Sequence, residues 1–246
     1  MTECLQSATM QSVLARCFAL FVGLISGMAV AAEQGPDEMR FQVFLGDKSI
    51  GFHTFTIERQ GATELVKVEA KFDVKVLFVP VYSYRHENTE VWRDGCLTRI
   101  DARTDDNGDY QKVNGERRGR RFEIVSSTGA RTLTVGCIMT FAYWNPEFLA
   151  QSRLLNAQNG KYIEVAIEQL DTQSVKLPNY EVPARGFRVW SEDQELDIKV
   201  WYTRDTGRWL ALEAIVDGGK TLRYLPAVDR RFVSALESTA RHAGPR

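Results

Sequence analysis

Residues 66–76 alternate strictly between apolar and charged side chains, and this pattern restricts the fold more than any other feature of the chain. A period of two is typical of a β-strand with one buried face. At about 3.3 Å per residue the strand would extend over roughly 36 Å, and long antiparallel strands coil as their twist accumulates. We therefore expect a mainly β protein built on a curled antiparallel sheet or half-barrel.

Turn signals recur along the rest of the chain, among them Asp94-Gly95, Asn107-Gly108 and Thr206-Gly207. Such dipeptides between apolar segments are typical of antiparallel hairpins. Residues 195–202 repeat the alternation, with Leu196, Ile198, Val200 and Tyr202 on the apolar face and Trp201 on the charged one. We expect these segments to extend the same sheet.

One short helix is expected from Asn145 to Leu155. Asn145 supplies a cap, Pro146 the first helical position and Glu147 an acid in the first turn. Its apolar face would pack on the sheet, and the aromatic patch at residues 141–146 would anchor it there. The tail from Asp229 to Ala243 has loose helical spacing and is expected to be helical or frayed.

Residues 1–31 are predicted to be a secretory signal peptide. Arg16 precedes an uncharged apolar run at residues 17–28, and Ala29-Val30-Ala31 follows it. The run is too short for a bilayer, which needs roughly 20 apolar residues. Cleavage after Ala31 would release residues 32–246 as a single β-rich domain, and we expect a periplasmic location.

Two cysteines remain outside the signal peptide, Cys96 and Cys137. In an oxidising compartment two cysteines most simply form one disulfide. They lack the C-x-x-C spacing of a redox pair, and no histidine lies close to them in the sequence. We therefore expect a structural disulfide.

The composition gives no reason to expect several common functions. The net charge is −1, which does not favour nucleic acid or an anionic membrane surface as a partner. Nucleophile and metal-binding motifs are absent, so no catalytic residue, metal or cofactor is assigned. His53 is interpreted as a structural residue. The acidic segment 105–109 is interpreted as a tight hairpin, and the basic cluster 116–121 as a solvated turn or, less favoured, a phosphate contact.

The segment from Tyr82 to Trp92 carries the candidate ligand-binding residues. Counting by two places an aromatic and polar row on one face of a strand, where rings supply apolar contact and polar groups orient a ligand. The assigned residues are Tyr82, Tyr84, His86, Glu90 and Trp92. The alternative is that the tyrosines and His86 cap the rim of the core and that Glu90 is solvated. His86 and Glu90 would lie about 13 Å apart, too far to form a catalytic pair within this strand.

Short motifs in a fixed order resemble those of a known family. They include Tyr82-x-Tyr84, Glu90-x-Trp92-x-x-Gly95, Tyr143-Trp144-Asn145 and Trp201-Tyr202. Together they resemble an uncharacterised family of exported bacterial proteins, a domain of unknown function. The resemblance implies a periplasmic, β-rich protein without an assigned activity. A curved sheet holding a helix is also similar to periplasmic carriers of lipids and lipoproteins, although fold does not fix function.

Three functions follow as hypotheses. The favoured one is a non-catalytic binding or carrier protein for a lipid or other apolar ligand. The second is an envelope adaptor that binds protein through a sheet edge or an aromatic patch. The third is a hydrolase, which requires His86 or His53 to lie near an acid or a hydroxyl from another strand.

Overall fold

The computed structural model describes residues 35–76, 78–134, 136–171, 173–178, 180–194, 196–216 and 219–227. The predicted signal peptide at residues 1–31 and the tail at residues 229–243 lie outside the described residues. Before the single 3-10 helix, the strands are β1 (Asp37–Leu45), β2 (Lys48–Gln60), β3 (Thr63–Val76), β4 (Val79–Arg93), β5 (Cys96–Asp106), β6 (Asp109–Arg118), β7 (Arg121–Ser126) and β8 (Gly129–Thr134). The 3-10 helix η1 (Pro146–Ala150) is followed by β9 (Arg153–Leu155), β10 (Tyr162–Glu164), β11 (Ala166–Gln169), β12 (Gln173–Leu177), β13 (Tyr180–Ser191), β14 (Leu196–Thr203), β15 (Trp209–Val216) and β16 (Lys220–Pro226).

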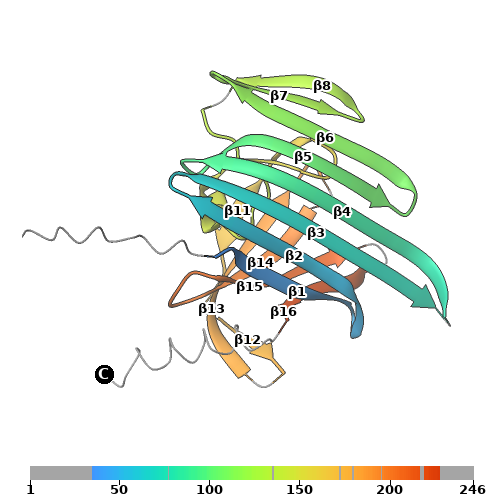
Figure 1. Cartoon of the computed structure of the whole chain (residues 1–246). Helices are drawn as coiled ribbons and strands as arrows, with labels where there is room; N and C mark the ends of the chain where they lie inside the picture. The colour runs from blue at the N-terminus through green and yellow to red at the C-terminus, as the bar shows by residue number, and fades with distance from the viewer. Residues whose placement is uncertain are drawn as a thin grey trace, which may run out of the picture. The chain divides into compact units, whose positions relative to one another are not determined.

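All the described strands except β9 and β10, which form a separate two-stranded sheet, belong to one large antiparallel sheet. Its order is β11-β13-β14-β15-β16-β1-β2-β3-β4-β5-β6-β7-β8, with β12 added beside β13. β1 pairs with both β2 and β16 and so joins the first hairpins to the last ones. Figure 1 shows β1 to β8 as a curved layer with β13 to β16 behind it. Among the described strands no pairing joins β8 to β11, so the sheet stays open, and the predicted fold class is confirmed.

β3 confirms the alternation on which the fold prediction depends. Val66, Val68, Ala70 and Phe72 are buried, whereas Lys67, Glu69 and Lys71 are exposed. Burying an apolar side chain contributes roughly 1.5–3 kcal/mol, so a shift in register by one residue would expose the whole set. We call the face that carries these apolar residues the inner face of the sheet.

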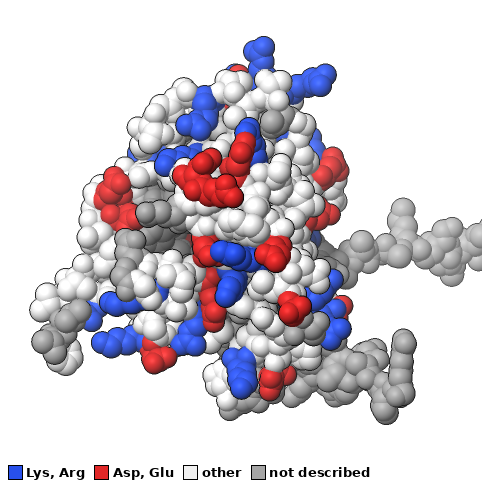
Figure 2. Space-filling model, turned by 180° about the vertical axis from the view of Figure 1, so that it is seen from behind, with Lys and Arg blue, Asp and Glu red and all other residues white. Residues whose placement is uncertain are grey.

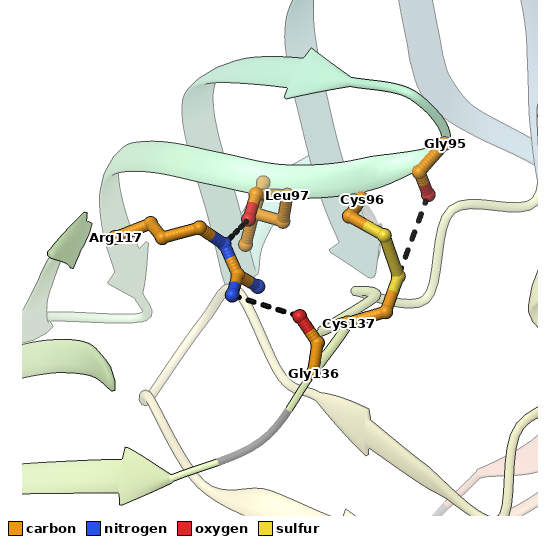
Figure 3. Close-up of a disulfide and its surroundings, with 6 residues drawn as sticks. All are labelled: Gly95, Cys96, Leu97, Arg117, Gly136 and Cys137. Atoms are coloured by element: carbon orange, nitrogen blue, oxygen red, sulfur yellow. Dashed lines mark hydrogen bonds between the residues drawn. A yellow bond between two sulfur atoms is a disulfide. The ribbon is translucent and has the colours of Figure 1, made fainter. Parts of the chain in front are cut away.

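Residues 136–165 pack against the inner face, and we call them the covering segment. Ile138, Phe148, Leu154 and Leu155 are fully buried in the same core as the sheet residues. The segment begins at the disulfide between Cys96 and Cys137, which confirms the predicted pairing. Beside it Arg117 donates to the carbonyl oxygens of Gly136 and Leu97, at 2.8 and 3.4 Å (Figure 3).

The expected helix from Asn145 to Leu155 is only one 3-10 turn. Its start is as predicted, because the Asn145 side chain accepts a hydrogen bond from the Glu147 backbone N–H. The chain becomes extended at Gln151, and β9 then pairs with β10. The reason is burial on two sides: Leu154 and Leu155 are adjacent and both fully buried, which suits an extended segment between two layers better than one helix face.

Trp201 differs from the expectation for a charged face. It is buried in a second, smaller cluster on the other side of the sheet, formed by residues of β12 to β15. Its indole N–H donates to Gln173 on β12 at 2.7 Å. The β12–β13 hairpin therefore covers part of the outer face, and period-two alternation alone could not reveal that cover.

Candidate functional site

The row predicted on β4 faces inward as one set. Tyr84, His86, Glu90 and Trp92 are buried, and Tyr82 is partly buried. The shared face is therefore confirmed, whereas a ligand-binding role for these residues stays a prediction. The two ends of the row lie in different surroundings.

The end of the row at Glu90 is closed by hydrogen bonds and by the covering segment. Glu90 accepts from the Asn88 amide and from the Trp92 indole N–H, both at 2.8 Å. Burial raises the pKa of Glu90, and hydrogen bonds from Asn88, Trp92 and Thr140 oppose that rise. Trp92 packs edge-on against Trp144, with ring centroids 5.4 Å apart, so the predicted anchoring by the aromatic patch is confirmed.

The end of the row at Tyr82 is more open and rich in hydroxyl groups. Tyr82 donates to Asp106 at 2.7 Å, and Tyr84 stacks on Phe72 with ring centroids 5.2 Å apart. Burial raises the pKa of both tyrosines. These residues stay neutral phenols that can donate hydrogen bonds.

His86 meets part of the requirement for a hydrolase. Its Nδ1 lies 2.9 Å from the Thr104 hydroxyl on β5. Thr104 is buried, and no carboxylate among the described residues bonds to His86. Burial lowers the pKa of His86 to about 4, which makes it a weak base. The pair therefore does not form the oriented triad that nucleophilic catalysis uses.

His53 on β2 is a partly buried histidine whose two ring nitrogens are shielded from solvent. Neither ring nitrogen has a partner among the described residues, and the ring stacks on Phe55 at 4.3 Å. Burial, and secondarily the nearby His86, lower its pKa to about 3. His53 is thus neutral and packed among aromatic rings.

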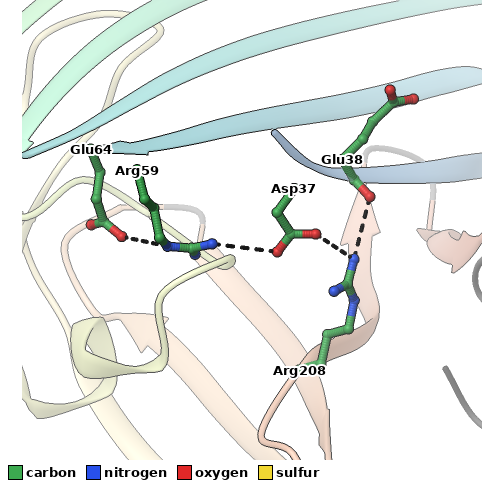
Figure 4. Close-up of polar contacts among 5 residues, drawn as sticks. All are labelled: Asp37, Glu38, Arg59, Glu64 and Arg208. Carbon is green, nitrogen blue, oxygen red and sulfur yellow. Dashed lines mark hydrogen bonds and ion pairs between the residues drawn. The ribbon is translucent and has the colours of Figure 1, made fainter. Parts of the chain in front are cut away.

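Two hollows flank η1, and Pro146 lines both of them. The first has a volume of about 390 Å³ and includes Arg59, Glu64, Asp94 and Glu147 in its wall. Arg59 bonds to Glu64 at 3.0 Å and to Asp37 at 3.7 Å. Asp37 in turn contacts Arg208 at 3.0 Å (Figure 4). The guanidinium of Arg59 is therefore already paired with acids, and the other charged residues in the wall of this hollow are acidic.

The second hollow has a volume of about 340 Å³ and mostly apolar walls. Leu149 of η1, Phe187 of β13 and Tyr202 of β14 line it, together with Arg185. Arg185 pairs directly across from Tyr202 in the sheet. Tyr202 is fixed, because its ring is buried and its hydroxyl donates to the Tyr143 carbonyl at 2.9 Å.

Arg185 is the charged side chain of the second hollow. It makes no hydrogen bond or ion pair with any residue in the described part of the chain. One of its guanidinium nitrogens lies 3.8 Å from where a Cβ would stand on Gly207, so the guanidinium extends over the 206–207 turn. The hollow therefore joins an apolar wall to an exposed cation that no described residue neutralises.

The sequence interpretation did not single out Arg185. One signal was present: Arg185 falls in phase with Phe187 and Val189 on the inner face of β13. A cation at an apolar phase of a strand departs from the usual alternation. Recognising the hollow also required η1, because Leu149 forms its opposite wall.

The charged side chains on the face opposite to that of Figure 1 are of both signs, and acidic and basic groups are interspersed there (Figure 2). In the basic cluster 116–121, Arg118 contacts Glu116 and Glu123, as expected for a solvated turn. In the part of the chain that the structure describes, no group of His, Cys, Asp and Glu could hold a metal ion. No helix among those residues is long and apolar enough to cross a bilayer.

These features define a class: an open, curled antiparallel β protein whose inner face is covered by one disulfide-anchored segment. The chain belongs to the family described as Domain of unknown function (DUF6134), whose model matches residues 41–227. The resemblance to an uncharacterised family is thereby confirmed, while export and a periplasmic location stay predictions. No curated protein matches the chain.

Proposed function

We propose that this protein binds an amphipathic anion in the second hollow. The carboxylate, sulfonate or phosphate of the ligand would lie on Arg185, and its apolar part on Leu149, Phe187 and Tyr202. The observation that carries the proposal is a cation without a partner among the described residues, at the edge of an apolar hollow. The proposal keeps the expected binding role for a lipid or other apolar ligand and moves it from the Tyr82–Trp92 row to this hollow.

The size and chemistry of the hollow support the proposal. Small-molecule sites usually occupy roughly 300–1,000 Å³ and combine apolar walls with a few polar groups, and this hollow, at about 340 Å³, lies at the lower end of that range. A guanidinium is weakly hydrated and binds carboxylates and phosphates through two parallel hydrogen bonds. A single-chain amphiphile therefore fits better than a whole phospholipid.

For the row on β4 we favour a structural role in the core over a ligand-binding one. The Glu90 carboxylate is bonded to the Asn88 amide N–H and to the Trp92 indole N–H within the core, so a ligand there would have to displace the covering segment. If residues 1–31 direct export as predicted, binding in the second hollow would make the protein a periplasmic carrier. The adaptor hypothesis has less support because a hollow is present, and the hydrolase hypothesis because no described acid bonds to His86.

Native mass spectrometry of the exported protein tests the proposal. We expect an added mass that denaturation releases and that extraction identifies as an amphipathic anion. In the Arg185→Glu variant the added mass should disappear, whereas Arg59→Glu, which alters the first hollow, should retain it. An unliganded protein that also fails to take up added dodecanoate would overturn the proposal.

A further inference from the structure

The β3–β4 hairpin extends beyond its neighbours. β2 pairs with β3 only as far as Phe72, and β5 pairs with β4 only from Tyr84. Between Val74 and Tyr82 the two strands pair only with each other. Figure 1 shows this ribbon projecting past the adjacent hairpins. A two-stranded ribbon is marginal in water, so a projecting one calls for a reason.

The described residues at the tip of this ribbon are apolar and exposed. Phe78 is 96% exposed, Val79 60% and Val81 50%, and these are three of the seven large apolar side chains exposed in the described part of the chain. Phe78 also has a φ of 71°, in the left-handed region that bulky residues rarely adopt. That conformation costs roughly 1–3 kcal/mol. Because the Phe78 side chain is almost fully exposed, it adds almost no buried apolar surface that would offset this cost.

We infer that this tip, formed by Phe78, Val79 and Val81, inserts into the surface of a lipid bilayer. The tip is narrow and projecting, whereas a stable protein interface needs roughly 800 Å² from each partner. Three apolar side chains suit shallow insertion, since interfacial elements bury their apolar parts only about 5–10 Å into the headgroup region.

The charges along the ribbon fit anionic headgroups. From Lys71 to Arg85 the ribbon carries three bases and one acid, Asp73. Asp73 already bonds to Arg85 at 2.7 Å, and Lys71 and Lys75 are exposed. Lys75 pairs with Pro80, directly below the tip, where its long side chain can reach headgroup phosphates while its stem follows apolar surface.

The acidic groups of the β5–β6 turn lie beside the base of the ribbon, where Asp106 accepts a hydrogen bond from Tyr82, and not beside its apex at Phe78. The β5–β6 turn carries Asp105, Asp106 and Asp109, and Asn107 of that turn bonds to the Ser83 backbone. Ser83 follows Phe78, at the apex of the ribbon, by five residues, or roughly 15 Å along a strand. This distance exceeds the Debye length of about 8 Å at physiological ionic strength. The net charge of the whole chain is −1, yet the projecting end of the β3–β4 ribbon is locally basic and apolar.

Co-sedimentation with vesicles of phosphatidylethanolamine and phosphatidylglycerol at 3:1 tests the inference. All proteins are purified after export, and their N-termini are matched by mass. We expect the Phe78→Ser, Val79→Ser double variant to lower vesicle partitioning by about tenfold, from lost apolar burial. The control double variant, Tyr110→Ser with Ile215→Ser, removes equally exposed apolar groups elsewhere and should partition like the wild type. Vesicles of neutral phosphatidylcholine should bind the wild type severalfold less.

The outcome is independent of ligand binding in the second hollow. Arg185→Glu should leave vesicle partitioning unchanged, and the tip variant should retain any co-purified ligand in native mass spectra. The inference is overturned if the wild type does not sediment with the vesicles, or if the tip variant sediments as the wild type does. A protein partner that requires Phe78 while vesicles are ignored would likewise overturn it.

Discussion

The two hollows beside η1 share a wall but differ in chemistry. The first is the larger, yet its base Arg59 is bonded to two acids and its other charges are acidic. The second is smaller and apolar, and Arg185 in its wall has no partner among the described residues. Volume therefore does not show which of the two hollows is the better candidate for a binding site. What distinguishes a candidate binding site is a charge that the fold itself does not neutralise, placed beside apolar surface.

The largest expected effect of a substitution at neutral pH comes from the disulfide, because it holds the segment that forms the shared wall. The Cys96→Ser, Cys137→Ser variant opens a loop with a sequence separation of 41. We expect the free energy of unfolding to fall by about 4 kcal/mol in the chain-entropy model. Urea denaturation measures this change. A loss below about 1 kcal/mol would show that the buried residues of the covering segment hold it without the disulfide.

His53 sharpens the comparison, because it also lacks a partner among the described residues, but its ring nitrogens are buried and its lowered pKa keeps it uncharged at neutral pH. The pKa values of His53 and His86 fall from 6.5 to about 3 and about 4, so the unfolded chain binds more protons below pH 6.5. The stability that these residues contribute is complete above pH 6.5 and is lost as the pH falls towards 4. By pH 4 we expect a loss of roughly 3 kcal/mol per histidine.

The His53→Phe variant isolates one of these contributions. Phe removes two unbonded polar atoms from an aromatic environment, so we expect a gain of about 1 kcal/mol at pH 7 and a shallower decline on acidification. Glu90, whose pKa is raised, acts in the opposite direction in both proteins and cancels from their difference. Urea denaturation at several pH values measures the slopes, and equal slopes would refute the assignment.

A bulky substitution in each hollow tests directly which of the two holds the ligand. Ala150 lines the second hollow and Ala62 lines the first, and both are exposed. Ala150→Trp should fill the ligand space and lower dodecanoate affinity about tenfold or more, because the apolar wall is lost to the ligand. Ala62→Trp should leave the affinity unchanged. Isothermal titration calorimetry measures both, and equal losses would place the ligand elsewhere.

The smallest expected effect concerns Asp37, which connects Arg59 and Arg208 (Figure 4). These contacts are partly exposed, so Asp37→Asn should lower the free energy of unfolding by at most about 1 kcal/mol, and by less at high salt. Ligand binding should not change. Thermal denaturation at two salt concentrations measures the effect, and a loss independent of salt would mean that Asp37 acts through something other than its charge.

Local patterns predicted much of the fold. The alternation on β3, the Asn145 cap and the Cys96–Cys137 pair each depend on few residues, and all three are confirmed. The covering segment was harder to foresee. Leu154 and Leu155 gain their burial from two layers at once, and no period in the sequence describes that.

The candidate site could be predicted only in part. The Tyr82–Trp92 row was recognisable because one strand carries it. The second hollow combines η1, β13, β14 and a turn, which meet only after the sheet has curled. Trp201 shows the same limit, since its cover comes from β12, outside the strand pattern that placed it on a charged face.

The central claim is that Arg185 and the apolar wall beside it bind an amphipathic anion. Displacement of bound anilinonaphthalene sulfonate, first by dodecanoate and then by dodecanol, tests it most directly. In the wild type and in Arg59→Glu we expect dodecanoate to displace the probe at concentrations about tenfold lower than dodecanol, as one charge-assisted hydrogen-bonded pair would give. In Arg185→Glu this preference should vanish. Equal displacement by both compounds in the wild type, or an unchanged preference in Arg185→Glu, would contradict the claim.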